Sequence, residues 1–135
     1  MIAEVALAAI AYATPCQADP LVPQLRAAGF TGRSLKFAWA IAMRESRGHP
    51  RSVSRGGDFG LFQFNRAAWS DAAWWDERRL LQPAYNASIA FSLSQAGHTF
   101  YPWDIDGAGR HLARYSSAAT FREDTLLAEL EIGRA

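Results

Sequence analysis

Apolar positions recur at helical spacing along most of the chain, and this period predicts a mainly helical domain. Ser34 is the expected N-cap of the third helix, and Pro83 is expected to begin the fourth. Glycine favours the position just beyond a helix end, so Gly29 and Gly97 are the expected stops. The predicted helical segments are residues 4–12, 21–29, 35–46, 83–97 and 110–132, the last as one helix or two.

The middle of the chain interrupts this helical pattern. Residues 47–57 are rich in Gly, Ser, Pro and Arg, a composition typical of a loop. The next segment, DFGLFQF at residues 58–64, is short and aromatic, and it is compatible with a strand or an extended turn. Residues 65–83 are expected to be helical in part, with Asn65 or Ser70 as N-cap. A second loop, rich in aromatic residues, is expected after the fourth helix.

The bulk composition is that of an ordinary globular domain. The 135 residues are 50% hydrophobic and 20% charged, with a formal net charge of +1, so no strong field points to nucleic acid. No apolar run approaches the roughly 18 residues of a membrane-spanning helix, so membrane insertion is not expected. Cys16 is the only cysteine, which leaves no internal disulfide. We expect one domain over residues 1–135 that requires no cofactor.

The N-terminal segment has some features of a secretion signal. Its apolar middle is followed by small residues, but its first residues carry Glu4 and no Lys or Arg. We therefore expect residues 1–30 to form a helical extension and not an export signal.

One carboxylate is notable for its position on the predicted helix 35–46. Glu45 shares a helix face with three small apolar residues, Ala38, Ile41 and Ala42. It also lies in the last turn, where the helix dipole is negative, so burial and the dipole both disfavour its ionised form. Enzymes that cleave sugars need a protonated carboxylic acid to donate to the leaving glycosidic oxygen. The alternative is a glutamate at a frayed helix end that pairs with a neighbouring arginine: Arg44, Arg47 or Arg51.

Three sequence blocks carry a resemblance to a known family. Glu45-Ser46 at a helix end, Gly60-Leu61-Phe62-Gln63 after a loop, and Tyr85-Asn86 at a helix start occur in this order. Together they resemble the lysozyme-like superfamily, and most closely the small lytic-transglycosylase-type domains that bacteriophages often encode. The resemblance covers roughly residues 35–103.

The resemblance implies a fold and a substrate. It implies a mainly α, lysozyme-like α+β fold with two lobes, a short hairpin around residues 55–64, and a cleft between the lobes. The substrate would be peptidoglycan, cleaved at the β-1,4 bond between N-acetylmuramic acid and N-acetylglucosamine. Glu45 would protonate the glycosidic oxygen and then act as a base. Other phage tail or virion proteins are the further expected partners, with action at the bacterial cell wall, in the periplasm or outside, after delivery by a phage particle.

The resemblance also implies substrate-binding residues. Ser46 would orient Glu45 or the acetamido group of the substrate, and Gln63 would hydrogen-bond the sugar. Tyr85 and Asn86 match the third block, although Asn86 is equally compatible with an N-cap. The remaining candidates for the cleft are Asn65, which follows the second block, and two residues of the aromatic loop, Tyr101 and Trp103.

Asp58 separates two reaction outcomes. A transglycosylase needs one carboxylate and leaves 1,6-anhydro ends, whereas a retaining hydrolase needs a second carboxylate roughly 5 Å from the first. The run DFGLFQFN resembles the segment of chicken-type lysozymes that begins with the second catalytic Asp, and Asp58 falls on that residue. The alternative is that Asp58 only caps the turn at Gly56-Gly57. We favour the transglycosylase, with a hydrolase as the alternative and an inactive structural or sugar-binding tail component as the second.

The remaining aromatic, basic and histidine side chains are predicted to lie in the core or at the surface. Trp39 and Trp69 are expected in the core. The basic loop beside Glu45 is interpreted either as a rim for the carboxylates of peptidoglycan or as a solvated surface. The histidines have no metal-ligand spacing; they are His49, His98 and His111.

Overall fold

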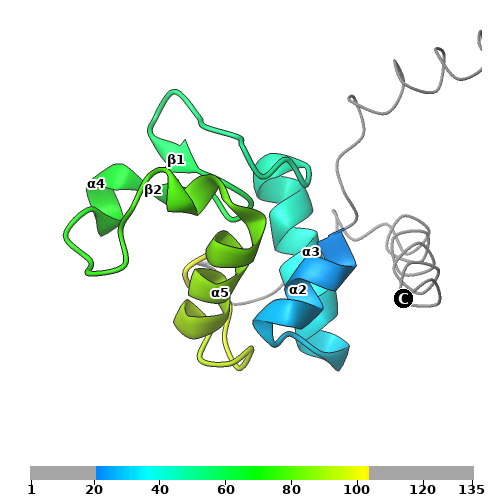
Figure 1. Cartoon of the computed structure of the whole chain (residues 1–135). Coiled ribbons are helices and arrows are strands. Elements are labelled where there is room, and N and C mark those ends of the chain that lie inside the picture. Colours follow the sequence, from blue (N-terminus) through cyan, green and yellow to red (C-terminus); the bar gives the residue numbers. More distant parts are fainter. Residues whose placement is uncertain (1–20, 104–135) are drawn as a thin grey trace, which may run out of the picture.

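The computed structural model describes residues 21–103, which form four α-helices, one 3-10 helix and a two-stranded hairpin (Figure 1). The helices predicted at residues 4–12 and 110–132 lie outside the described residues. In chain order the elements are α2 (Leu21–Ala28), α3 (Gly32–Ser46), β1 (Asp58–Phe59), β2 (Phe64–Asn65), α4 (Arg66–Trp69), η2 (Arg79–Leu81) and α5 (Pro83–Leu93).

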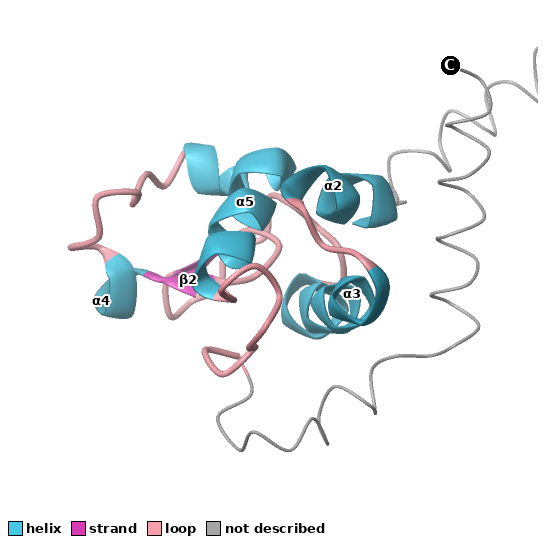
Figure 2. Cartoon of the chain, turned by 90° about the horizontal axis from the view of Figure 1, so that it is seen from below, coloured by secondary structure: helices cyan, strands magenta, loops and turns pink. Residues whose placement is uncertain are grey.

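Helix α5 lies between two parts of the fold. Helices α2 and α3 lie on one side of it, and the hairpin with α4 lies on the other, as Figures 1 and 2 both show. The three longer helices share one core, to which α2 contributes Leu21, Val22 and Leu25. The segment predicted as an N-terminal extension therefore takes part in the core from Leu21 onward. The other large buried side chains include Phe30, Trp39, Ile41, Leu61, Phe62 and Leu80.

Helix α3 begins three residues earlier than the sequence predicts. Its N-cap is Thr31, in an extended conformation, and not Ser34. The Ser34 hydroxyl instead accepts a hydrogen bond from the Thr31 amide at 3.1 Å and donates to the Thr31 carbonyl at 2.7 Å. Ser34 thus occupies the third helical position, from which a polar side chain reaches back to the N-cap backbone. The helix ends at Ser46, after which Arg47 adopts a left-handed conformation (φ 55°).

Helix α5 starts where it was predicted but ends earlier. Pro83 occupies its first turn after the N-cap Gln82, so the prediction that Asn86 is an N-cap is wrong. The helix ends at Leu93, and Gly97 lies in the following turn. Gly97 has φ +84°, and a Cβ there would lie 2.7 Å from the Cβ of Ser34. Gly97 therefore allows the loop after α5 to pack closely against the start of α3, which is a different role from helix termination.

The hairpin confirms the prediction of a short two-stranded element in this region. Asp58 pairs with Asn65 and Phe59 pairs with Phe64 in antiparallel register, and Val53 adds an isolated bridge to Phe59. Of the two predicted candidates, Asn65 and Ser70, Asn65 is the N-cap of α4, because its side-chain oxygen accepts a hydrogen bond from Ala68 N.

The turn of this hairpin depends on Gly60. The residue has φ +78°, and a Cβ on it would lie 2.2 Å from both Asn86 Nδ2 and the Leu80 carbonyl oxygen. No side chain fits there without moving backbone. Gly60 therefore allows the hairpin turn to approach η2 and α5 closely.

We predict that Gly60→Ala lowers the free energy of unfolding by about 3–5 kcal/mol, from left-handed strain plus overpacking. Gly32→Ala is the matched control, since Gly32 also has positive φ (+51°) but has nothing within 4 Å of the added methyl group. The control should cost only the strain, about 1–2 kcal/mol. Equal losses for the two variants in urea denaturation would contradict the close approach at Gly60.

Candidate active site

Glu45 lies in the last turn of α3, at the edge of its buried face. The three apolar residues predicted to share this face, Ala38, Ile41 and Ala42, are fully buried. The Glu45 side chain is 28% exposed, so its carboxylate is accessible from solvent. The face was therefore predicted correctly, and Glu45 marks the point where it emerges at the surface.

The Glu45 carboxylate is held through one oxygen only. Both Nε and Nη2 of Arg44 donate to Glu45 Oε1, at 3.2 and 2.8 Å. Within the described part of the chain, Glu45 Oε2 accepts no hydrogen bond. Of the three arginines considered as partners from the sequence, Arg44 is the one that pairs.

Arg44 also reaches a segment far along the chain. Its Nη2 donates to the carbonyl oxygen of Trp103 at 2.6 Å, and the Trp103 indole Nε1 donates to the Phe62 carbonyl oxygen at 3.1 Å. The end of α3, the loop after α5 and the hairpin turn therefore meet at this point. Sequence reasoning missed this link, because Arg44 and Trp103 are 59 positions apart and neither belongs to the three blocks.

Ser46 does not orient Glu45 in this structure. Its hydroxyl donates to the Ala42 carbonyl at 3.0 Å and accepts from the Gly48 amide at 3.2 Å, and the side chain is buried. The Ser46 hydroxyl thus joins the last turn of α3 to the Gly48 amide in the loop that follows. The expected hydrogen bond between Ser46 and Glu45 is absent.

Asn86 is part of the interior and not of a substrate-binding wall. It is 0% exposed. Its Nδ2 donates to the carbonyl oxygens of Phe59 (3.1 Å) and Leu80 (2.9 Å), and its Oδ1 accepts from Phe62 N (3.0 Å). All three hydrogen bonds of this buried amide are internal, so substrate binding by Asn86 stays a prediction that would need these bonds to break. Its role is to join the hairpin turn to η2 and α5.

Gln63 is turned back onto the loop that precedes it. It has a left-handed backbone (φ 53°), and its Nε2 donates to Ser52 O at 3.2 Å and Gly60 O at 2.9 Å. Among the described residues its Oε1 has no donor, so one side-chain atom remains available to a ligand. Gln63 as a substrate-binding residue stays a prediction, restricted to that oxygen.

Asp58 closes the turn before the hairpin. Its Oδ2 accepts from the Ser54 hydroxyl, and its amide donates to the same hydroxyl at 3.0 Å. Its Oδ1 accepts from Asn65 Nδ2 at 2.9 Å, across the strand pair. Both carboxylate oxygens therefore have partners, which is the arrangement expected of a turn-capping Asp. Asn65 is engaged at both side-chain atoms, because it also caps α4.

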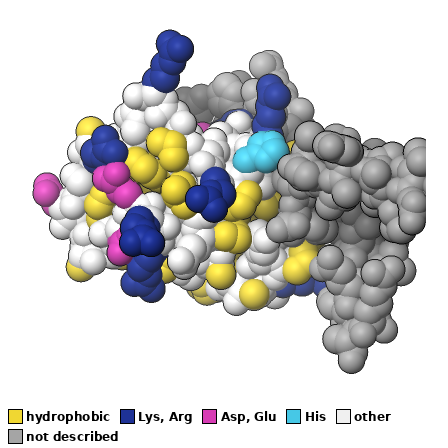
Figure 3. All heavy atoms as spheres, turned by 45° about the horizontal axis from the view of Figure 1, so that its top comes forward, with side chains coloured by type: hydrophobic (Ala, Val, Ile, Leu, Met, Phe, Trp, Pro, Cys, Tyr) yellow, Lys and Arg dark blue, Asp and Glu magenta, His cyan; other side chains and the backbone are white. Residues whose placement is uncertain are grey.

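Aromatic side chains connect the hairpin to the loop after α5. The rings of Trp69 and Trp74 lie 5.5 Å apart, Trp74 and Phe64 lie 5.5 Å apart, and Phe64 and Trp103 lie 6.0 Å apart. Trp103 is half-buried and Tyr101 is 64% exposed. Such rings suit the apolar faces of sugars. Figure 3 shows hydrophobic side chains exposed between arginines on the face that carries the hairpin and the end of α3.

The remaining aromatic predictions concern Trp39, Trp69 and Tyr85. Trp39 is in the core, as predicted, whereas Trp69 is only partly buried. Tyr85 is half-buried, its hydroxyl donates to the Trp74 carbonyl, and the Arg79 guanidinium lies 4.1 Å from its ring centroid. Tyr85 therefore fixes the loop that contains Trp74. Its predicted contact with substrate would involve the part of the ring that Arg79 does not cover.

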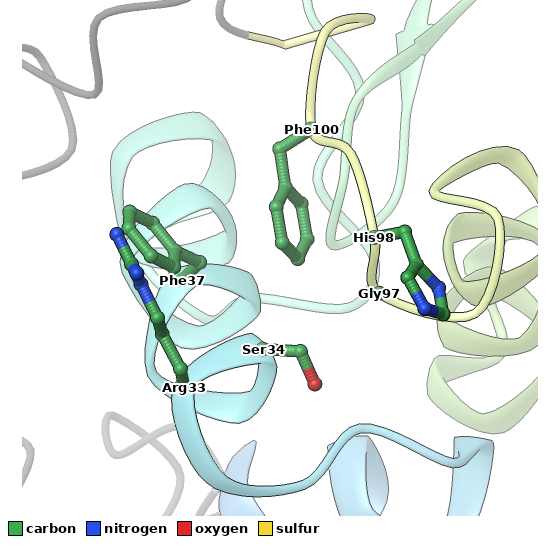
Figure 4. Close-up of a pocket in the computed structure, with 6 residues that line it drawn as sticks. All are labelled: Arg33, Ser34, Phe37, Gly97, His98 and Phe100. Carbon is green, nitrogen blue, oxygen red and sulfur yellow. The ribbon is translucent and has the colours of Figure 1, made fainter.

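A pocket of about 360 Å³ lies at the other end of α3. Arg33 and Phe37 of α3 face the segment Gly97–Phe100 across it (Figure 4). Ser34 lies at its base, 11 residues before Glu45, a helical distance of about 16 Å. The pocket is therefore separate from the carboxylate. Within residues 21–103, no group of three His, Cys, Asp or Glu side chains is placed to hold a metal ion.

The family of the chain agrees with this geometry. The lysozyme-like domain family matches residues 24–105, more than half of the sequence, and the chain belongs to that family. All the candidate site residues, from Glu45 to Trp103, lie within the matched range. No curated protein and no solved structure matches the chain. Family membership supports a peptidoglycan-cleaving glycosidase as the general activity and the bacterial cell wall as its place of action.

The described helices are too short or too polar to span a membrane. Over residues 21–103, none of the helices combines the length and the apolar character needed to cross a bilayer.

Outside this site, one ion pair gives the stability a dependence on pH. Arg66 donates twice to Glu77, at 2.9 and 2.7 Å, and Trp75 Nε1 donates to Glu77 Oε2 at 3.3 Å. The hydrogen bonds from Arg66 lower the pKa of the Glu77 carboxyl, and the same bonds raise the pKa of Arg66. The pair is exposed, so its effect is small and screened by salt.

We predict that wild type is more stable than Glu77→Gln at neutral pH and loses this advantage in acid. Because the pKa of Glu77 is lower in the folded protein, its ionised form contributes stability at pH values above the unfolded-state pKa, about 4.3. This contribution is lost as the pH falls through the folded-state pKa. Melting temperatures of both proteins from pH 7 to pH 2 should converge at the acid end. Asp71→Asn, which removes an exposed carboxylate without a described partner, should not reproduce this pattern. A constant gap between wild type and Glu77→Gln down to pH 2 would contradict the pairing.

We predict that Asn86→Asp destabilises the protein by about 3 kcal/mol or more at neutral pH. An ionised carboxylate cannot donate to the Phe59 and Leu80 carbonyls and would lie against both. Protonation restores one donor, so stability should partly recover as the pH falls. The control is Gln82→Glu, the same change at the exposed N-cap of α5. Equal stability of Asn86→Asp and wild type in urea at pH 7 would contradict the role of Asn86.

Proposed function

We propose that the chain is a lytic transglycosylase that cleaves the β-1,4 bond between N-acetylmuramic acid and N-acetylglucosamine, with Glu45 as general acid and then base. The observation that carries the proposal is the state of the Glu45 carboxylate. One oxygen is held by Arg44, and the other is free of described partners at a solvent-accessible helix end. A general acid requires this combination of a fixed group and an available oxygen.

The proposed reaction needs one carboxylate. Glu45 donates a proton to the glycosidic oxygen as the bond from that oxygen to C1 of the muramic acid breaks. The 6-hydroxyl of the same sugar then forms a bond to C1, and its proton passes to the Glu45 carboxylate. The products are a new 4-hydroxyl and a 1,6-anhydro end, with no water consumed.

The engagement of Asp58 supports this outcome over hydrolysis. A retaining hydrolase uses its second carboxylate as a nucleophile, which needs an oxygen directed at the anomeric carbon of the sugar. The oxygens of Asp58 are instead directed at Ser54 and Asn65, from which they accept hydrogen bonds. The muramidase that uses Glu45 with Asp58 is therefore the second candidate, and it would require an Asp58 oxygen to face the sugar as well.

Substrate contacts are proposed for accessible groups of the hairpin turn and of the loop that ends at Trp103. They are the exposed Tyr101 ring, the partly buried Trp103 ring and the free side-chain oxygen of Gln63. We also propose, on the sequence resemblance alone, that a phage particle or a larger assembly delivers the domain to the wall. If the domain is instead an inactive tail component, wild type and all variants should release no muropeptides.

We predict that Glu45→Gln reduces muropeptide release from purified sacculi by at least about 100-fold, because the amide cannot donate the proton. Release is measured by chromatography of the soluble products at equal protein concentration, after equal melting temperatures have been verified. Asp58→Asn should retain much of the activity if its hydrogen bonds only close the turn. Asp71→Asn is the control for the loss of a carboxylate elsewhere.

Three results would contradict the proposal. Wild-type activity in Glu45→Gln would remove Glu45 from catalysis. Loss of activity in folded Asp58→Asn, as complete as in Glu45→Gln, would favour the muramidase. No release by wild type would favour the inactive component.

A further inference from the structure

We propose that Arg44 is a positioning residue, which fixes the orientation of Glu45 and couples it to the aromatic loop that ends at Trp103. The catalytic half of this inference rests on the proposed function of Glu45. The coupling half rests on hydrogen bonds alone and is testable without activity.

The contact between Arg44 and Glu45 is unusual for neighbours on a helix. Successive side chains point about 100° apart, so adjacent residues do not ordinarily face one another. Here the Arg44 side chain bends toward Glu45, and it is only 15% exposed. The second acceptor accounts for this path, because Nη2 also donates to the Trp103 carbonyl at 2.6 Å. The guanidinium is thus fixed at the Trp103 carbonyl independently of its bonds to Glu45.

The arrangement of donors selects one carboxylate oxygen. An arginine that pairs side-on with a carboxylate uses both oxygens. In this structure Nε and Nη2 of Arg44 both donate to Oε1 of Glu45, at 3.2 and 2.8 Å. Oε2 is therefore left as the atom that carries the proton to the substrate. Arg44 in this way sets both the rotamer of Glu45 and the oxygen that it offers.

The same guanidinium extends the contact to the rest of the fold. Trp103 donates through its indole to the Phe62 carbonyl, and the Phe62 amide donates to the buried side chain of Asn86. A continuous series of hydrogen bonds therefore joins Glu45 to the interior of α5. Loss of Arg44 would free Glu45 and also remove one anchor of the loop that carries Tyr101.

The other arginines near Glu45 do not share this role. Within the described residues, Arg47, Arg51 and Arg55 make no hydrogen bond or ion pair through their side chains, and all three are exposed. Arg51→Met therefore provides a matched control, because it removes the same charge from the same surface. Arg44→Lys is the conservative variant, since an ammonium group keeps the charge but cannot span the same acceptors in a fixed plane.

Two measurements on the full chain test the inference. In the first, hydrogen exchange by mass spectrometry follows the segment 99–103, where the Trp103 amide donates to Phe100 O. Exchange of this segment should accelerate in Arg44→Met and remain at the wild-type rate in Arg51→Met. Unchanged exchange in Arg44→Met would overturn the coupling, whatever the activity of the protein.

In the second, muropeptide release from sacculi gives kcat and KM. Arg44→Met should lower kcat by about 100-fold with KM changed much less, because a misplaced acid slows the chemistry. Arg44→Lys should recover part of kcat, and Arg51→Met should keep the wild-type kcat, since a basic rim would act on substrate binding and hence on KM. A wild-type kcat in Arg44→Met, with Glu45→Gln inactive, would overturn the positioning role while the proposed function stands. An inactive wild type would overturn the proposed function and the catalytic half together.

Discussion

The amide of Asn86 lies fully buried between the hairpin turn and two helical segments, where it satisfies three backbone groups at once. A buried polar group without a hydrogen-bond partner costs more free energy than a formed hydrogen bond contributes. Separation of the three segments would therefore destabilise the fold at this point. The close approach is possible because Gly60 carries no Cβ. This junction sets where the turn lies relative to α5, and with it the position of Phe62.

Phe62 connects that junction to the candidate site. Its amide is held by Asn86, and its carbonyl accepts from the Trp103 indole. The Trp103 carbonyl in turn receives the guanidinium of Arg44, which fixes Glu45. The surface where Glu45 emerges is thus built on a buried polar network and not on packing alone. Asn86 and Ser46, which the resemblance associates with the substrate, make internal hydrogen bonds in the structure that supports the site.

The sequence predicted the parts of the fold that depend on local pattern. The period of α3 placed Ala38, Ile41 and Ala42 inside and Glu45 on the same face. A short hairpin was expected around residues 55–64, and Asn65 was one of two candidate caps for the helix that follows. The failures were of two physical kinds. Thr31 and Ser34 are both good caps, and only backbone geometry distinguishes an N-cap from a third-position side chain. Asn86 and Arg44 depend on partners up to 59 positions away, and no local pattern in one sequence encodes such contacts.

The most direct test of a one-carboxylate reaction is the fate of solvent oxygen. Sacculi digested in water enriched in oxygen-18 would be analysed by mass spectrometry of the released muropeptides. Attack by the sugar's own 6-hydroxyl predicts anhydro ends 18 Da lighter than reducing ends and without label. Reducing ends that carry oxygen-18 would show attack by water. That result would contradict the account and would favour Asp58 as the second catalytic carboxylate.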